Sequence, residues 1–91
     1  MRINKTIDAF NKINSKISNG SKKRCREKFQ YKGIGKLINS ACWIINLEGV
    51  DTVISEFIYD YDDPQLYNVM LFLLKENFDI DELNKFDYID E

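Results

Sequence analysis

The sequence predicts a single small α/β (α+β) domain that combines several helices with a few strands. Two segments, 34–47 and 65–77, have apolar residues at helical spacing or on nearly every side, and capping residues lie at their ends. Between them, residues 52–59 have the sequence TVISEFIY, a β-branched and aromatic run typical of a buried strand. The predicted order is an N-terminal helix, a strand, a glycine loop, a helix, a strand, a helix and a short C-terminal element.

The N-terminal third contains one predicted helix followed by a basic segment. Apolar residues recur through residues 4–17 at helical spacing, and the run Ser18–Ser21 ends that helix. The next residues, 22–29, are basic with few apolar members, and their spacing leaves a short strand and a solvated loop equally open. The predicted divisions of this single domain are an N-terminal helix at 1–21, a core at 22–80 and an acidic tail at 81–91.

The remaining elements have clearer boundaries. In the second helix, Ile34, Ile38, Ala41 and Ile45 lie on one stripe, and Gly49 supplies a C-cap. The acidic run before Pro64 supplies an N-cap for the third helix, whose apolar residues predict burial on most sides. The sequence of the tail, residues 78–91, predicts a short helical turn and a final edge strand.

Composition excludes several classes of function. The chain has 91 residues, no histidine, and two cysteines, Cys25 and Cys42, whose spacing fits neither a metal site nor a redox motif. Zinc chemistry and histidine-based catalysis are therefore not expected, and the site prediction includes no metal. No run approaches the roughly 18 apolar residues of a membrane span, and no export signal is recognised. We therefore expect a cytoplasmic protein with reduced cysteines.

The charges divide the chain into two unlike parts. Residues 1–36 contain eleven basic residues against two acidic ones, whereas residues 37–91 contain two basic residues against thirteen acidic ones. A basic region suits the phosphates of a nucleic acid or a cofactor, and an acidic region suits a basic partner or only solubility. Alternatively, the two parts attract each other within the fold or across a homodimer.

Two glycines stand one residue apart in the stretch FQYKGIGKLI, residues 29–38. Gln30, Gly33 and Gly35 resemble the Gln/Arg-x-x-Gly-x-Gly/Ala signature of the GCN5-related N-acetyltransferases (GNAT). The resemblance covers about residues 24–80 and implies a minimal, truncated GNAT-like domain. It also implies acetyl-CoA as cofactor, with the CoA pyrophosphate bound by the backbone of Tyr31–Lys36. The predicted cofactor-binding residues are Gln30, Tyr31, Lys32, Gly33, Ile34, Gly35 and Lys36.

Catalytic residues are harder to assign. The resemblance places the family's general-acid tyrosine at Leu73 and its usual asparagine at Leu66, so no acid is identified. Glu56, within the predicted strand, is the best available general base because burial raises a carboxyl pKa, although a solvent-facing Glu56 fits the same pattern. Cys25, among four cations, is either a reactive thiol of lowered pKa or a plain, partly buried one.

Two functions of different classes follow. The first is an acetyl-CoA-binding, GNAT-like protein that transfers an acetyl group to a lysine or another amine of a protein partner. The length and the position of the motif resemble the small anti-CRISPR acetyltransferases of phages. The alternative is a non-enzymatic inhibitor from a phage or mobile element, anti-CRISPR-like, which binds a host nuclease complex through its acidic C-terminal surface. The basic run 22–26 adds a candidate site for nucleic acid or for the 3′-phosphate of CoA.

Overall fold

The computed structural model describes residues 17–90, and all regular structure in that range is helical. The elements are α2 (Asn19–Phe29), α3 (Ile34–Glu48), α4 (Val50–Val53), the π-helix η1 (Ile54–Ile58), α5 (Pro64–Asn77) and the 3₁₀-helix η2 (Asp81–Lys85). The prediction of an α/β, GNAT-like domain was wrong, because the described residues form an all-α domain with four α-helices, one π-helix and one 3₁₀-helix, and without a strand.

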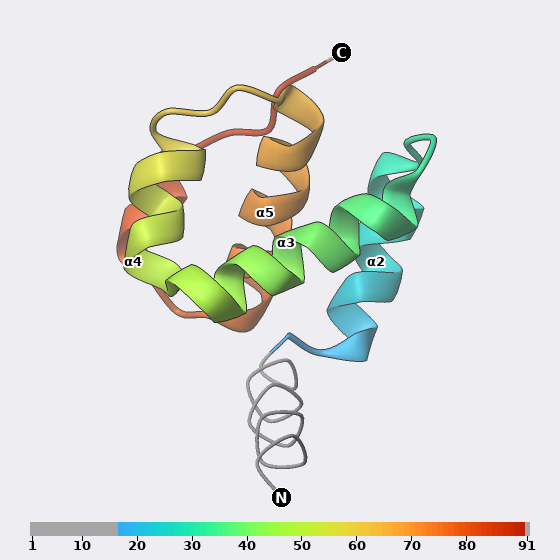
Figure 1. Cartoon of the computed structure of the whole chain (residues 1–91), viewed down its shortest axis with the longest axis horizontal. Coiled ribbons are helices and arrows are strands. Elements are labelled where there is room, and N and C mark those ends of the chain that lie inside the picture. The colour runs from blue at the N-terminus through green and yellow to red at the C-terminus, as the bar shows by residue number, and fades with distance from the viewer. Residues whose placement is uncertain (1–16, 91) are drawn as a thin grey trace, which may run out of the picture.

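Helix α5 is the centre of the domain. Each residue from Tyr67 to Leu74 is buried, because α2, α3, η1 and η2 all pack against this helix. Figure 1 shows α5 between α2 on one side and the α4–η1 segment on the other, with α3 crossing in front. The prediction that most of this helix is buried is confirmed, and the apolar core is continuous around it.

The helices predicted from capping and periodicity are also confirmed. Helix α3 spans Ile34–Glu48 and ends where the Gly49 N–H donates to the Ile45 carbonyl, at 3.0 Å. Helix α5 begins at Pro64, and the Asp63 carboxylate accepts a hydrogen bond from the Gln65 N–H at 3.0 Å. Both ends follow ordinary capping chemistry, because the Asp63 side chain and the Gly49 N–H satisfy backbone groups at the two helix ends.

Residues 22–29 form neither the strand nor the loop that their sequence left open, but most of helix α2. Ser18 caps the helix by accepting a hydrogen bond from the Ser21 N–H at 3.0 Å. Ser21 and Cys25 are buried four residues apart, and half-buried Phe29 continues the same face. Asn77 at the end of α5 fixes this helix start, since it accepts from the Ser18 N–H and donates to the Ser21 hydroxyl, both at 2.9 Å.

Residues 52–59 are helical, and the predicted strand is absent. The chain continues from α4 into η1, where the Tyr59 N–H donates to the Ile54 carbonyl five residues earlier, at 3.0 Å. Val53, Ile54 and Ile58 are buried, and Ser55 and Glu56 are exposed. This inside–outside pattern has the period of a helix, so packing against α5 and α3 has outweighed the β-propensity of the β-branched residues.

The tail contains the predicted helical turn, η2, but the final edge strand is also absent. Residues 86–90 are irregular backbone, and side chains of α5 bind them. Tyr67 Oη donates to the Asp87 carbonyl at 2.8 Å, and Lys75 Nζ donates to the Phe86 carbonyl at 2.9 Å. Asn68 donates to the Ile89 carbonyl and accepts from the Ile89 N–H, both at 2.8 Å. Hydrogen bonds with side chains of α5 thus satisfy the tail's backbone groups, as a partner strand would in a sheet.

The predicted N-terminal helix over 4–17 lies almost wholly outside the described residues, as do most of the predicted 1–21 segment and Glu91. Ile17 is buried in the core, and Ser18–Ser21 begin α2. Among the helices that the structure describes, none has the length and apolar character needed to cross a membrane.

Candidate functional site

The predicted cofactor loop, Gln30–Lys36, forms the turn between α2 and α3. Gln30 has φ 49° and ends α2, and Gly33 has φ 76° and begins α3 without a side-chain cap. The positive φ explains Gly33, because residues with a Cβ rarely adopt it. Gly35 is an ordinary helical residue with open space around it. The turn follows a helix, whereas the resemblance implied a preceding strand, so acetyl-CoA binding at this turn stays a prediction.

The predicted base, Glu56, lies far from that turn. Glu56 is exposed on η1, at the opposite side of the molecule from the α2–α3 turn in Figure 1. A general base acts only within hydrogen-bond reach of the group whose proton it takes. The structure therefore does not bring the predicted cofactor-binding residues and Glu56 into one site. Leu73, at the family's tyrosine position, is fully buried in α5.

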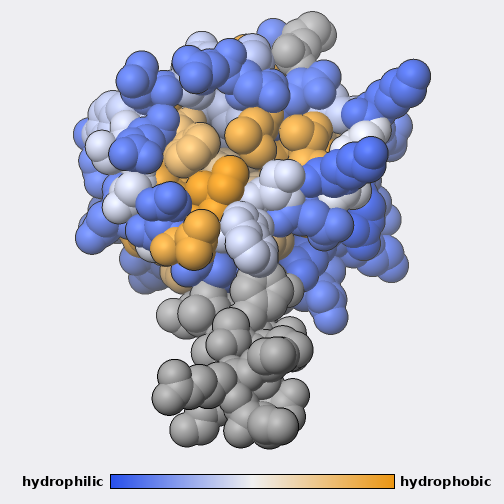
Figure 2. Space-filling view, in the orientation of Figure 1, coloured by the Kyte–Doolittle hydropathy of each residue, from blue (hydrophilic) through white to orange (hydrophobic). Residues whose placement is uncertain are grey.

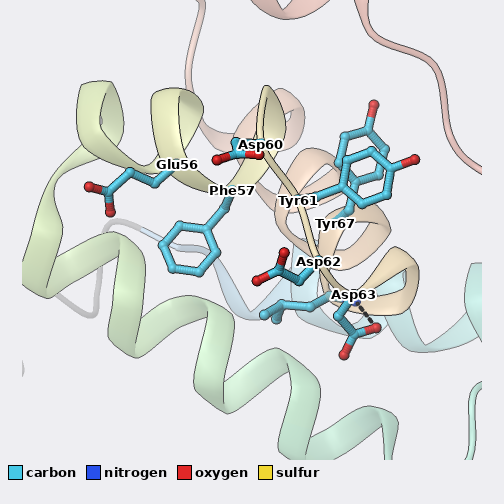
Figure 3. A pocket seen from close by; sticks show the side chains of 8 residues that line it. Glu56, Phe57, Asp60, Tyr61, Asp62, Asp63 and Tyr67 are labelled. Atoms are coloured by element: carbon cyan, nitrogen blue, oxygen red, sulfur yellow. Dashed lines mark hydrogen bonds between the residues drawn. The ribbon is translucent and has the colours of Figure 1, made fainter.

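Glu56 instead belongs to an acidic pocket between η1 and the start of α5 (Figure 3). The pocket has a volume of about 120 Å³. Its lining combines four carboxylates with aromatic and aliphatic side chains: Glu56, Phe57, Asp60, Tyr61, Asp62, Asp63, Leu66 and Tyr67. No basic residue contributes to this lining within the described part of the chain.

The carboxylates of the pocket differ in what they contact. Asp63 caps α5 through the Gln65 and Leu66 N–H groups. Glu56, Asp60 and Asp62 make no hydrogen bond or ion pair with a described residue. Four like charges around one opening, three of them without a described partner, create a negative potential that attracts a cation. Residues 17–90 contain no group of His, Cys, Asp or Glu arranged to hold a metal ion.

Aromatic side chains form the walls. The rings of Tyr61 and Tyr67 lie 4.7 Å apart, and Figure 3 shows Phe57 extending from η1 toward the α3 side. Tyr67 Oη is bound to the Asp87 carbonyl, and burial raises the pKa of this phenol, with the neighbouring Tyr61 and Asp87 adding to the shift. Tyr67 is therefore neutral at physiological pH, and its buried ring supports the more exposed ring of Tyr61.

The sequence had indicated only part of this site. The acidic run 60–63 and Glu56 were candidates for an acidic surface and a base, but Phe57 lay in the predicted buried strand and Leu66 in the predicted third helix, and neither was a candidate site residue. Glu56 lies on η1 and Asp60 lies two residues after its end, and the four-residue spacing between them is the one that places two side chains on one face of a helix. That spacing was the signal, and the strand prediction for 52–59 concealed it.

Cys25 is not the reactive thiol that its basic neighbours suggested. Its side chain is fully buried, and burial raises its pKa to about 12, with nearby Cys42 adding to the shift and Arg26 opposing it. Only the thiolate is a good nucleophile. Cys25 and Cys42 are both free thiols inside the core, which fits a structural role.

Comparison with known proteins adds no family to this description. No family model matches the chain, and neither a curated protein nor a solved structure matches it.

Proposed function

We propose that this chain is a non-enzymatic binding protein whose acidic pocket takes a basic side chain of a partner protein. The partner would be a protein with an exposed basic surface, such as the nucleic-acid-binding surface of a host nuclease complex, and binding would block that surface. The observation that carries the proposal is the pocket itself, with three carboxylates free of described partners around aromatic walls.

The size of the pocket favours a single side chain. Pockets for whole small molecules have volumes of about 300–1,000 Å³. The 120 Å³ pocket is well below that range. A guanidinium or ammonium group fits because its charge meets Asp60 and Asp62 while its stem lies against Phe57 and Leu66. Arginine is favoured over lysine, since its planar group also stacks on aromatic rings.

Apolar surface beside the pocket extends the proposed interface. Figure 2 shows hydrophobic surface gathered on the face over α3, surrounded by hydrophilic surface. On α3, Leu47 is 67% exposed, and Ile44 and Leu37 are half-buried. Protein interfaces commonly place such an apolar area next to a charged anchor. A basic, amphipathic segment could therefore place its cation in the pocket and its apolar residues against α3.

The test uses fluorescence anisotropy with a short labelled peptide of arginine and leucine. We expect binding to wild-type protein at about 50 mM salt that weakens as salt rises, and a loss of at least tenfold in Asp60→Asn/Asp62→Asn. The control variant Asp79→Asn/Asp81→Asn removes the same charge from exposed residues outside the pocket. An equal loss in both variants, or no binding by the wild type, would contradict the proposal.

The acetyl-CoA prediction is decided by a separate experiment. Calorimetry with acetyl-CoA would be run on the wild type and on Gly33→Glu, which places a negative charge at the start of α3. Heat in the wild type that disappears in a Gly33→Glu variant whose circular dichroism is unchanged would establish the acyl-CoA site and replace the proposal of a binding protein without enzymatic activity. We expect no heat at millimolar cofactor, because α2 stands where the family's supporting strand would be.

A further inference from the structure

The first two described helices meet at a short turn and leave a polar, basic surface. Helix α2 and helix α3 are joined by residues 30–33, pack against each other, and cross steeply in Figure 1. Helix α5 packs against both from behind. Two helices that cross at a Gly-containing turn of this length, supported by a third, are the arrangement of a helix-turn-helix unit.

Cations lie along α2, in the turn and at the start of α3, and most of them have no acidic partner. Lys23, Arg26, Lys32 and Lys36 are exposed, Lys22 is half-buried, and none of the five forms an ion pair within residues 17–90. By contrast, Arg24 pairs with Glu76 at 2.6 Å, and Lys28 lies 4.9 Å from the ring centroid of Tyr88. The five cations are therefore available to neutralise phosphates of a polyanion.

The first turns of α3 present short polar side chains between these cations. Gly35, Lys36, Asn39 and Ser40 are all exposed, and Lys36 and Ser40 lie on the side of α3 opposite buried Ile38. The side chains of Lys36, Asn39 and Ser40 make no hydrogen bond with a described residue. Lysine and asparagine are among the side chains that contact base edges in the major groove.

We infer that α2, the turn and the first half of α3 form a surface for double-stranded DNA. The start of α3 enters the major groove with Lys36, Asn39 and Ser40 toward the bases, while the cations of α2 and the turn contact phosphates. The acidic pocket lies away from the duplex, because η1 and the turn are at opposite sides of the molecule. This surface is independent of the pocket and of its proposed partner.

The test measures anisotropy of a labelled duplex DNA of random sequence with the full chain. We expect binding at about 50 mM salt, with a slope of log affinity against log salt of about −4 to −5 for five contacts. Lys23→Gln/Arg26→Gln should weaken binding at least tenfold and reduce the slope by about two. Both residues are exposed, and circular dichroism checks that the variant remains folded.

Two comparisons distinguish DNA binding by this surface from nonspecific electrostatic attraction. Arg26→Gln should weaken binding, whereas Lys85→Gln, an exposed cation on η2, should change the affinity by less than about twofold. Duplex RNA of the same sequence should bind at least tenfold more weakly, because its major groove does not admit a helix. No binding to the DNA, equal losses in Arg26→Gln and Lys85→Gln, or RNA bound as tightly as DNA would each overturn the inference.

Discussion

The basic end of the molecule, formed by α2, the turn and the start of α3, differs from its acidic end at η1, the 59–63 loop and η2 in more than sign. Within residues 17–90 one ion pair joins α2 to the acidic remainder of the chain, between Arg24 and Glu76, and the other, Lys85 with Glu82, lies within η2. The opposite charges are therefore hardly used to hold the fold together. Burial around α5 stabilises the domain, and the charges remain available to partners.

The two ends also differ in shape. The cations of the basic end are spread along an exposed helix and a turn, which suits an extended polymer of phosphates. The carboxylates of the acidic end surround a small pocket with aromatic walls, which suits one cationic side chain. Two surfaces of opposite charge and unlike shape, on one core, suit the two different partners proposed above better than two halves of one site.

The largest expected effect comes from a substitution in the buried core around α5, against which α2, α3 and η1 all pack. Leu73→Ala deletes a fully buried side chain of α5 and should lower the free energy of unfolding by about 3 kcal/mol. Leu47→Ala is the matched control, because this leucine is 67% exposed. Urea unfolding measures both variants. A smaller loss in Leu73→Ala than in Leu47→Ala would show that α5 is not the centre of the core.

A smaller effect should follow from removing the side chain that holds the C-terminal tail beside the basic turn. Buried Asn68 donates to Tyr31 Oη beside the basic turn and bonds both backbone groups of Ile89 in the tail. Asn68→Ala leaves these groups unsatisfied and should cost about 2 kcal/mol, with loss of hydrogen-exchange protection at the Ile89 amide. Exposed Asn84→Ala is the control. Continued protection of Ile89 in Asn68→Ala would contradict this role.

The last effect appears only at alkaline pH and concerns the buried thiol of Cys25 in α2. Burial raises the pKa of Cys25 from 9.0 to about 12, so the unfolded chain loses this proton first as pH rises. Its contribution to stability is complete below pH 9 and falls as pH rises toward 12, by about 1 kcal/mol per pH unit. Urea unfolding across this range should show a shallower decline in Cys25→Ala than in the wild type. Parallel declines would indicate that other groups, such as Tyr88, determine the alkaline limit.

The sequence predicted an element correctly where the spacing of its apolar residues and their secondary-structure propensities indicated the same element. For α3 and α5 they agreed: Ile38, Ala41 and Ile45 gave the helical stripe, and Pro64 gave the start of α5. For 52–59 they disagreed, because β-branched residues suggested a strand while the burial of Val53, Ile54 and Ile58 follows a helix. Only the contacts of that segment with α5 and α3 settle such a conflict.

The candidate site was predictable to a smaller extent. The acidic character of residues 56–63 was visible in the sequence, but the pocket needs Phe57 from η1 and Tyr67 from α5, which meet only when the helices pack. Likewise, the glycine loop was correctly placed at the start of α3, whereas its support is α2 rather than a strand. The charge and turn-forming residues of each segment were therefore predictable from the sequence. Which other helices pack against that segment was not.

The most direct test of two independent surfaces is the affinity of the arginine–leucine peptide for three proteins: wild type, Asp60→Asn/Asp62→Asn and Lys23→Gln/Arg26→Gln. The pocket variant should bind at least tenfold more weakly than the wild type, since it lacks two carboxylates that face the peptide cation. The α2 variant should bind within about twofold of the wild type, because its changes lie at the other end of the molecule. Equal affinity of the pocket variant and the wild type would contradict the account.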